Sequence, residues 1–333
     1  MSLPQFRILQ PPTVDEACRM LNEHGAEAMI IAGGTDVIPN LQMKLFAPRI
    51  LVDIKPIREL SKIELSPREG LRIGATASLT RILEMPWLAD KFPVLSSAIA
   101  TIAGPLQRNM GTIGGNLCLE TRCRWYNQSY FWRQSLGGCL KKDGDTCHVA
   151  PGGKFCWAAW SGDSAPALLT LDAEVEIVSL SGTRRIPLRD FYKNDGKDRI
   201  ALARNELLTA VHVPARMAGR RGAYHKLRVR DSIDYPLAGV AVAMEVDASS
   251  ICRDARVALS AVNPAPMLVG DSTQALVGQR WSLELAERVA HAAIQTGKPL
   301  TTSGSTPVYR RDMVRVFTRR ALEEVWKTAP HGS

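Results

Sequence analysis

The sequence lacks the features of several protein classes. It contains no run of about 18 or more apolar residues, so we expect no membrane-spanning helix. Its start, MSLPQFRILQPPTVDEA, has no basic segment followed by an apolar one, so we expect no secretory signal and predict a cytoplasmic protein. There is also no internal repeat and no low-complexity segment. What remains is a globular chain of 333 residues, 45% hydrophobic and 23% charged, which is long enough for two or three domains with ordinary cores.

A basic patch is missing as well, although the formal net charge is +9. The Lys and Arg residues are scattered among acidic ones, and no basic cluster is interleaved with aromatic residues as in nucleic-acid-binding proteins. We therefore expect no nucleic-acid partner. A solvated surface is the plain interpretation, and salt-sensitive docking of an acidic protein is the functional alternative.

Neither the dinucleotide fingerprint G-x-G-x-x-G nor the Walker P-loop is present. Two other glycine pairs are, in IAGGTD (residues 31–36) and GTIGGN (residues 111–116). Because glycine has no Cβ, such loops let backbone N–H groups approach a phosphate closely, and two of them can clamp one pyrophosphate. Each pair taken alone is more often a tight turn, so both interpretations stay open.

The cysteines are unevenly distributed. Four of the seven lie in one aromatic-rich stretch: Cys123, Cys139, Cys147 and Cys156. Four converging thiolates suit a 4Fe-4S cluster or a zinc ion, and in a reducing compartment metal binding is favoured over disulfides. The spacing C-x15-C-x7-C-x8-C has neither the paired C-x2-C knuckles of zinc modules nor the tight ferredoxin run. Spacing alone therefore leaves zinc and iron-sulfur open.

Hydrophobic periodicity and turn residues predict a mixed α and β chain. Residues 13–25 read as a capped helix, followed by a strand at 28–33, a helix at 41–46 and a strand at 49–54. Two strands flank the turn at 66–70. Residues 80–103 are helical but interrupted at Pro86 and Pro93.

The second half has more strand character. A helix near residue 165 precedes two strands joined at Ser181-Gly182, and another strand spans 206–215. Residues 214–222 look like a boundary loop. Beyond it we predict a smaller α+β domain, with strands at 224–230, 237–247 and 255–262 and helices at 282–295 and 310–326.

Three segments carry a specific resemblance: IAGGTDVIPNLQMK, TIGGNLC and SGDSAPALLTLDAEVEI. They resemble the FAD-binding subunits of the xanthine dehydrogenase, or molybdenum hydroxylase, superfamily, over nearly the whole chain. The resemblance implies an α+β fold with a two-lobed FAD-binding domain at residues 1–218 and lobes at about 1–56 and 57–218. A C-terminal domain like that of the carbon monoxide dehydrogenase flavoprotein would follow at residues 219–330.

The same resemblance implies a set of flavin contacts. The two glycine loops would hold the FAD pyrophosphate through Ile30, Ile31, Ala32, Gly33, Gly34, Thr35, Asp36 and Val37, and through Thr112, Gly114, Gly115 and Asn116. Ile102 would lie by the isoalloxazine, Asp163 would bind ribityl or ribose hydroxyls, and Leu208 and Lys226 would add further contacts. The plain alternatives are a helix N-cap for Asp163, a core position for Leu208 and a solvated strand lysine for Lys226.

Between the GGN loop and the SGD segment, this chain departs from most of the family by an insert of about forty residues, at about 119–161. All four clustered cysteines lie in it. A metal insert beside a flavin favours a 4Fe-4S electron relay, because zinc has no redox chemistry. The cysteine order and the runs NLCLETRC and GDTCHVAP resemble the β subunits of 4-hydroxybenzoyl-CoA reductases, which carry such a cluster. A related insert occurs in the flavin subunits of bacterial molybdenum aldehyde oxidoreductases.

Several neighbours of the proposed ligands receive supporting roles. We expect aromatic residues to shield the cluster or to form a small local core: Trp125, Tyr126, Tyr130, Phe131, Trp132, Trp157 and Trp160. Cys118 is expected to pack beside FAD rather than to bind metal, Cys18 and Cys252 to be buried thiols, and His148 to donate a hydrogen bond.

The resemblance makes this chain an electron-transfer subunit with no catalytic residues of its own. It implies a large molybdopterin subunit and a small subunit with 2Fe-2S clusters, in a dimer of heterotrimers. Electrons would pass from a ferredoxin-type donor through 4Fe-4S and FAD to molybdenum, where 4-hydroxybenzoyl-CoA is dehydroxylated to benzoyl-CoA. The alternatives are the subunit of an aldehyde oxidoreductase or other hydroxylase, and a zinc-stabilised flavin module without a relay.

Overall fold

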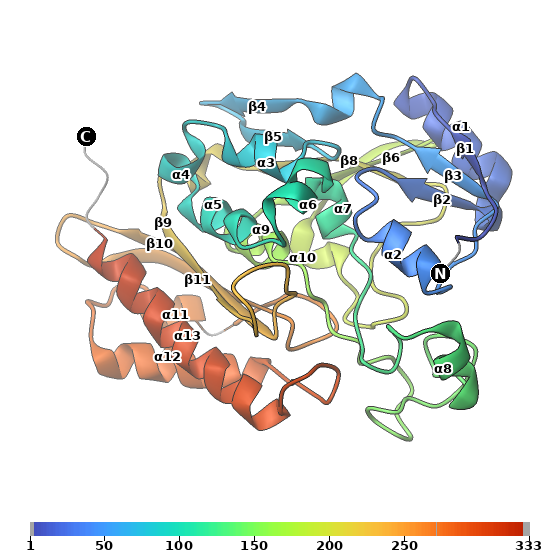
Figure 1. Ribbon diagram of the computed structural model, residues 1–333. Coiled ribbons are helices and arrows are strands. Elements are labelled where there is room, and N and C mark those ends of the chain that lie inside the picture. Colours follow the sequence, from blue (N-terminus) through green and yellow to red (C-terminus); the bar gives the residue numbers. More distant parts are fainter. Residues whose placement is uncertain (1–2, 271, 329–333) are drawn as a thin grey trace.

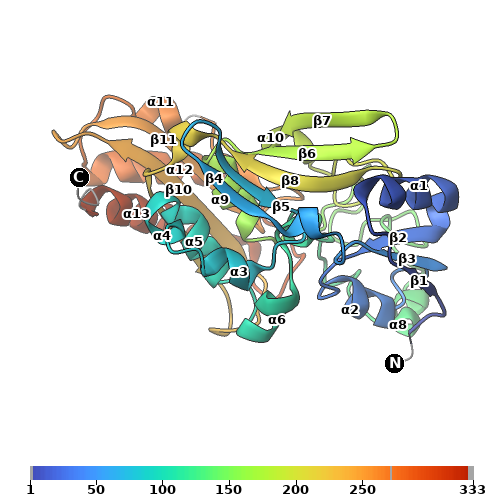
Figure 2. The same cartoon turned by 90° about the horizontal axis from the view of Figure 1, so that it is seen from above.

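The strands form three separate sheets in the computed structural model, which describes residues 3–270 and 272–328. A small parallel sheet lies at the N-terminal end, a five-stranded antiparallel sheet in the middle and a four-stranded antiparallel sheet at the C-terminal end (Figures 1 and 2). Within residues 3–270 and 272–328, no helix has both the length and the apolar character needed to cross a bilayer.

The N-terminal lobe is a parallel sheet in the order β1-β3-β2, covered by helix α1. Its elements are β1 (Arg7–Leu9), α1 (Val14–His24), β2 (Ala28–Ile31), α2 (Val37–Gln42) and β3 (Ile50–Asp53). Thr13 caps α1 by accepting a hydrogen bond from the Glu16 N–H at 3.2 Å, and Gly25 ends the helix at φ +47°. The helix expected at 41–46 is wrong in position, because Lys44 adopts φ +54° and the helix instead occupies α2.

The second lobe is built on the five-stranded sheet in the order β4-β5-β8-β6-β7, with every pairing antiparallel. Its strands are β4 (Ile63–Ser66), β5 (Gly70–Gly74), β6 (Glu174–Ser179), β7 (Gly182–Pro187) and β8 (Leu207–Val213). Its helices are α3 (Leu79–Leu83), α4 (Leu88–Lys91), α5 (Pro93–Ala100), α6 (Pro105–Met110), α7 (Ile113–Leu117), α9 (Ser164–Thr170) and α10 (Leu188–Phe191). Pro86 separates α3 from α4 and Pro93 opens α5, as predicted.

The cysteine-rich insert projects from this lobe and contains one helix, α8 (Tyr130–Ser135) (Figure 1). Its two ends are joined by a pair of backbone hydrogen bonds between Arg122 and Ala159, at 2.8 and 2.7 Å. The insert therefore leaves the second lobe and returns to it at nearly one point, so its fold adds to the lobe without interrupting it.

The C-terminal domain is built on a four-stranded sheet. The sheet packs between the helices of the domain and helices α5 and α9 of the second lobe. The sheet has the order β12 (Met267–Leu268), β11 (Cys252–Ser260), β10 (Ala238–Val246) and β9 (Arg221–Leu227), and its helices are α11 (Ser272–Leu276), α12 (Leu283–Thr296) and α13 (Pro307–Lys327). Along β10, Val240 and Val242 face the core with α12 and α13, while Ala241 and Ala243 face the core of the second lobe. Both faces of β10 are thus buried, which explains its nearly continuous apolar sequence. Three short 3₁₀ turns complete the chain at Gly25–Glu27, Arg58–Ser61 and Ala215–Met217.

Candidate functional site

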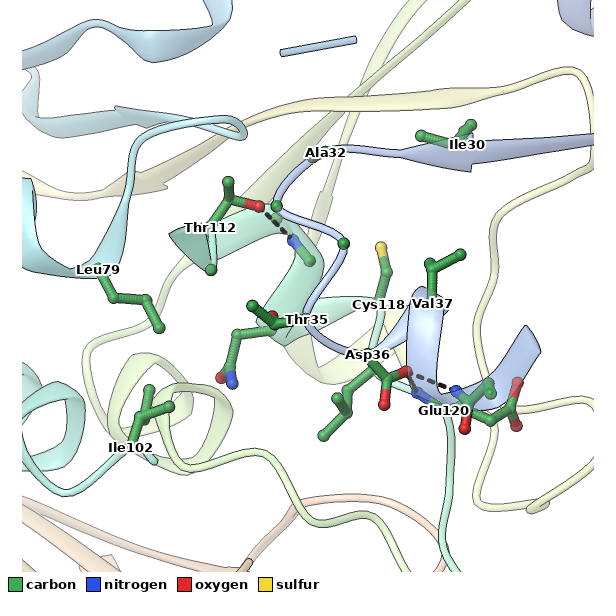
Figure 3. A pocket seen from close by; sticks show the side chains of 18 of the residues that line it. Ile30, Ala32, Thr35, Asp36, Val37, Leu79, Ile102, Thr112, Cys118 and Glu120 are labelled. Carbon is green, nitrogen blue, oxygen red and sulfur yellow. Dashed lines mark hydrogen bonds between the residues drawn. The ribbon is translucent and has the colours of Figure 1, made fainter. Parts of the chain in front are cut away.

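A cavity of about 550 Å³ opens between the N-terminal lobe and the second lobe (Figure 3). Its volume lies in the range of cofactor pockets. Most of the predicted flavin contacts line it: Ile30, Ala32, Gly33, Gly34, Thr35, Asp36, Val37, Ile102, Thr112, Gly114, Gly115, Asn116, Asp163 and Leu208. Ile31 and Lys226 do not. The fold therefore gathers around one space residues that the sequence separates by more than a hundred positions.

The first glycine loop connects β2 to α2 and needs its glycines for two different reasons. Gly34 has φ +72°, a backbone conformation that side-chain-bearing residues rarely adopt. Gly33 packs so closely on α6 that an added Cβ would lie 2.0 Å from the Met110 carbonyl oxygen. Close packing of the two loops, besides any approach of a phosphate, therefore requires glycine at position 33.

The second glycine loop begins the short helix α7. The Thr112 hydroxyl caps this helix by accepting a hydrogen bond from the Gly115 N–H at 3.1 Å, drawn in Figure 3. Gly114 packs against Ala75, where an added Cβ would meet the Ala75 Cβ at 2.8 Å. Gly115 instead faces the cavity, and an added Cβ there would have only Thr112 Oγ1 as a near neighbour, at 3.0 Å. The loop thus combines a fixed backbone with an open side toward the cavity.

Asp163 lies at the start of α9 and is held by two buried partners. Its carboxylate accepts hydrogen bonds from the Tyr224 hydroxyl at 2.6 Å and from Lys226 Nζ at 2.9 Å. The side chains of Asp163 and Lys226 are only 4% and 2% exposed. Burial raises the pKa of Asp163, although Lys226 and Tyr224 act in the opposite direction. Asp163 occupies the N-cap position of α9, but its side chain makes no capping hydrogen bond there.

Lys226 is not the solvated lysine considered as its plain alternative. It donates a second hydrogen bond to the Thr101 carbonyl oxygen at 2.9 Å, and it touches the cavity only through Asp163. Its role in the described structure is to neutralise and orient the carboxylate that lines the cavity.

Replacing Asp163 with asparagine is expected to destabilise the protein by about 3–5 kcal/mol, because Lys226 would keep its buried charge without a counter-ion. Urea unfolding of the purified chain measures this loss. The double variant Asp163→Asn with Lys226→Met is expected to regain part of it. As a control, Glu324→Gln removes an exposed carboxylate that pairs with His225 on the same strand, and its cost is expected to stay below about 1 kcal/mol.

Asp36 ties the first loop to the base of the insert. Its carboxylate accepts hydrogen bonds from Arg122 Nη1 at 3.0 Å, Asn40 Nδ2 at 3.1 Å and the Glu120 N–H at 3.3 Å. Burial raises the pKa of Asp36, while Arg122 lowers it. Asn40 Oδ1 is buried at the cavity wall and has no hydrogen-bond partner among the described residues. A ligand with hydroxyl or amide donors, such as FAD, fits this vacant acceptor.

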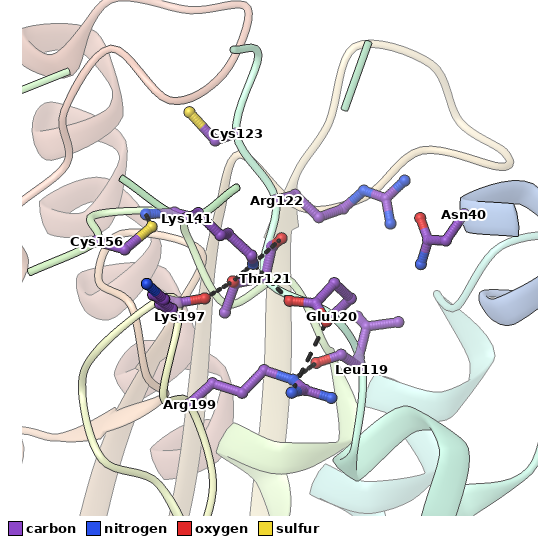
Figure 4. Close-up of polar contacts among 12 residues, drawn as sticks. Asn40, Leu119, Glu120, Thr121, Arg122, Cys123, Lys141, Cys156, Lys197 and Arg199 are labelled. Carbon is purple, nitrogen blue, oxygen red and sulfur yellow. Dashed lines mark hydrogen bonds and ion pairs between the residues drawn. The ribbon is translucent and has the colours of Figure 1, made fainter. Parts of the chain in front are cut away.

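Residues that sequence reasoning missed form a charged cluster (Figure 4). The cluster adjoins Asp36, which accepts a hydrogen bond from the Glu120 N–H. Glu120 forms an ion pair with Lys141 and lies 3.8 Å from Arg199. Arg199 also donates to the carbonyl oxygens of Leu119 at 3.0 Å and Cys118 at 2.9 Å. Burial opposes the charge of Glu120, yet Lys141 and Arg199 lower its pKa overall. No local pattern marks these residues, since Arg199 reaches the cluster from a loop about eighty positions away.

The four clustered cysteines surround a second, small cavity inside the insert. It is lined by Cys123, Cys139, Cys147, Cys156, Trp125, Tyr126, Leu140, Lys141, His148, Val149 and Ala158. All four thiols are free and each residue is less than a tenth exposed. Burial raises the pKa of both Cys123 and Cys156 to about 11, so these thiols stay protonated unless a metal replaces the proton.

The walls of the small cavity are aromatic and fixed. Trp125 packs against Trp132 and His148, with ring centroids 5.8 and 5.2 Å away, and His148 Nε2 lies 2.6 Å from the Gly138 carbonyl oxygen. The Trp125 indole N–H is buried without a hydrogen-bond partner in the described part of the chain. Across residues 3–270 and 272–328, no three His, Cys, Asp or Glu side chains lie close enough to ligate one metal ion. The cavity therefore offers four thiols and a vacant N–H donor in a dry setting.

Comparison with known proteins assigns both halves of the chain. Residues 4–216 match the FAD binding domain in molybdopterin dehydrogenase, and residues 222–325 match the CO dehydrogenase flavoprotein C-terminal domain. The chain is 35% identical over 307 residues to the FAD-binding subunit of an aldehyde oxidoreductase from Escherichia coli K12, covering 90% of each. It is 27% identical over 325 residues to the FAD subunit of nicotinate dehydrogenase from Eubacterium barkeri, covering 97% of each.

Solved structures agree with these matches. A reconstituted CO dehydrogenase from Oligotropha carboxidovorans superposes with a TM-score of 0.82 at 26% identity, over 99% of this chain and 100% of that one. The predicted fold, a mixed FAD-binding domain followed by a C-terminal domain of the CO dehydrogenase flavoprotein type, is confirmed. The chain therefore belongs to the FAD-binding subunits of the molybdenum hydroxylase family, the family of xanthine and carbon monoxide dehydrogenases.

Proposed function

We propose that this subunit transfers electrons between a 4Fe-4S cluster in the small cavity and FAD in the large one. The observation that carries the proposal is the meeting of Cys123, Cys139, Cys147 and Cys156 around one buried space. The short segment 118–123 joins the walls of the two cavities, since Cys118 lines the large one and Cys123 the small one. A cluster in the small cavity and FAD in the large one would therefore be connected by a segment of only six residues, which suits electron transfer between them.

A cluster and a single zinc ion place different demands on the four thiols. Zinc binds its sulfur ligands at about 2.3 Å and draws them around one point. In a cubane cluster each cysteine binds a different iron, so the four sulfurs stay farther apart. The four thiols that line the small cavity would supply one ligand for each iron of such a cluster. The vacant Trp125 N–H fits as a hydrogen-bond donor to a cluster sulfur, which is a common means of adjusting cluster potential.

In the large cavity, the two glycine loops would hold the FAD pyrophosphate, and Asp163 would accept from ribityl or ribose hydroxyls. FAD supplies chemistry that accepts electrons one or two at a time and so joins one-electron clusters to a two-electron reaction. Asp36 and Arg122 fix the first loop against the insert. Lys226 favours the ionised form of Asp163 and orients its carboxylate without lining the flavin site itself.

The reaction itself takes place on partner subunits. A relative of this chain is named the medium chain of carbon monoxide dehydrogenase, which supports an assembly with a large molybdopterin subunit and a small 2Fe-2S subunit. We propose a dimer of such heterotrimers, and a cytoplasmic location stays a prediction.

Two reactions are candidates for the activity of the assembled complex. The 35% identity to the FAD-binding subunit of an aldehyde oxidoreductase favours oxidation of an aldehyde, with electrons leaving through the relay. The order and surroundings of the four cysteines favour the second candidate, in which a ferredoxin-type donor reduces the cluster and 4-hydroxybenzoyl-CoA is dehydroxylated. Assays of the purified complex separate them. Turnover of benzaldehyde with ferricyanide supports the first, and benzoyl-CoA formed with reduced viologen supports the second.

The cofactor content of the purified chain tests the relay directly. We expect about four iron, about four acid-labile sulfide and about one FAD per chain, with an EPR signal after anaerobic reduction by dithionite. Zinc without sulfide would replace the relay by a structural metal site. Flavin without any metal would exclude both the cluster and a zinc site in the insert.

A further inference from the structure

Lys141 occupies the space between the two cavities. It lines the small cavity together with the four cysteines, and its ammonium group reaches back to Glu120, which lines the large cavity (Figure 4). The side chains of Lys141 and Glu120 are 5% and 9% exposed. Its neighbour Lys142 is different, since its side chain is 31% exposed and pairs with Asp143.

The position of the Lys141 ammonium group is fixed. Its three hydrogens are matched by three acceptors: the Glu120 carboxylate, the Thr121 carbonyl oxygen at 3.1 Å and the Thr121 hydroxyl. The group also lies 4.4 Å from the centre of the Tyr126 ring, another wall of the small cavity. A lysine with every donor engaged and almost no exposure acts as a fixed charge.

The charges in this region do not cancel. Glu120 faces two cations, Lys141 and Arg199, while Asp36 is matched by Arg122. Two further charges belong to this region: Asp195 accepts a hydrogen bond from the Cys156 N–H at 3.3 Å, and the buried Arg133 meets only backbone carbonyl oxygens. Four cations and three carboxylates then leave one positive charge over, next to four thiol groups. Burial lowers the pKa of Lys141, and Glu120 and Cys156 oppose this effect only in part. Four thiolates around a bound cluster add to their opposition.

We propose that Lys141 is the positioning residue that raises the reduction potential of the cluster relative to that of the flavin, because Glu120 holds its positive charge at the wall of the small cavity. This inference rests on the proposed function, because it requires a 4Fe-4S cluster in the small cavity. Reduction adds one electron, and so one negative charge, to the cluster, and it forms or breaks no bond to Lys141. A nearby fixed cation stabilises the more negative, reduced state.

The test is a redox titration of the cluster, followed by EPR, in the full chain and three variants. Lys141→Met is expected to change the equilibrium between oxidised and reduced cluster at least tenfold toward the oxidised state, a fall in potential of about 59 mV. Lys141→Arg keeps the charge and is expected to stay near the wild-type potential. Lys142→Met, the matched control, removes an equally charged neighbour that lies partly in solvent and should leave the potential unchanged.

Glu120→Gln distinguishes an electrostatic role from a structural one. Removing the carboxylate leaves Lys141 less neutralised, so the potential is expected to rise, opposite to the effect of Lys141→Met. If Lys141→Met fails to retain its cluster, Lys141→Gln takes its place, since it removes the charge and keeps a hydrogen-bond donor. Equal potentials in all variants, or shifts of the same sign in Lys141→Met and Glu120→Gln, overturn this inference and leave the proposed function standing. A wild-type chain without iron and sulfide overturns the proposed function and this inference together.

Discussion

Replacing Cys139 with serine is expected to remove the iron-sulfur cluster and to leave FAD bound. Cys139 lies on a tight turn, where it exchanges two backbone hydrogen bonds with Lys142, each 2.8 Å long. Its side chain contributes to the small cavity and not to the large one. A serine hydroxyl is a hard, weakly acidic group that replaces a thiolate ligand poorly. We expect iron to fall from about four to below about one per chain, with flavin absorbance unchanged.

Cys118→Ser is the matched control for this experiment. Cys118 lies five positions before Cys123, but it lines the large cavity, and burial raises the pKa of its thiol to about 11. We expect this variant to keep its iron and sulfide. Full iron content in Cys139→Ser would remove Cys139 from the ligand set, and loss of iron in Cys118→Ser would add Cys118 to it.

Local sequence signals explain much of the fold. The helix after Thr13 was predictable because a capping threonine, a glutamate three positions later and a final glycine mark both of its ends. Pro86 and Pro93 mark breaks for an equally local reason. The prediction of a helix at 41–46 was wrong for an equally local reason. Pro39 is tolerated in the first turn of α2, and the backbone reversal at Lys44 has no residue signature.

The site was predictable where it consists of glycine loops and less so where it depends on tertiary contacts. Ile30 and Ile31 are neighbours on β2, yet only Ile30 of the two lines the cavity. Tyr224 and Lys226 are two positions apart on β9 and therefore share the face that meets Asp163. That pairing requires the fold to bring β9 to Asp163 at the start of α9, which no sequence period reveals.

The charged group of Glu120, Lys141 and Arg199 could not be predicted from the sequence, because it too depends on tertiary contacts. Its members come from the entry to the insert, from a turn inside it and from a loop before β8. Each alone reads as an ordinary surface charge in the sequence. Their burial follows from the insert folding back on the lobe at Arg122 and Ala159, so their function is visible only once the chain is folded.

Replacing Gly115 with leucine is expected to lower flavin content at least tenfold, an affinity loss of about 1.4 kcal/mol or more. The added side chain would enter the large cavity between the two glycine loops, where the pyrophosphate is proposed to lie. Gly115 is the suitable position because the one atom close to an added Cβ is a side-chain oxygen, Thr112 Oγ1 at 3.0 Å, which needs to shift only slightly. At Gly33 even a methyl group would meet the Met110 backbone, and at Gly34 the positive φ would strain any other residue. Those substitutions would disturb the loop itself, whereas Gly115→Leu fills the space beside it.

Gly304→Leu is the control, since Gly304 is exposed, has nothing within 4 Å of an added Cβ and lies outside the cavity. Flavin content is measured by absorbance after purification of both variants, and circular dichroism shows that each is folded. Because Gly115 and the cysteine cavity are separate, iron content is expected to remain at its wild-type level in Gly115→Leu. A folded Gly115→Leu chain with full flavin content would mean that the cofactor phosphates do not pass between the two loops. The large cavity would then hold FAD in another orientation.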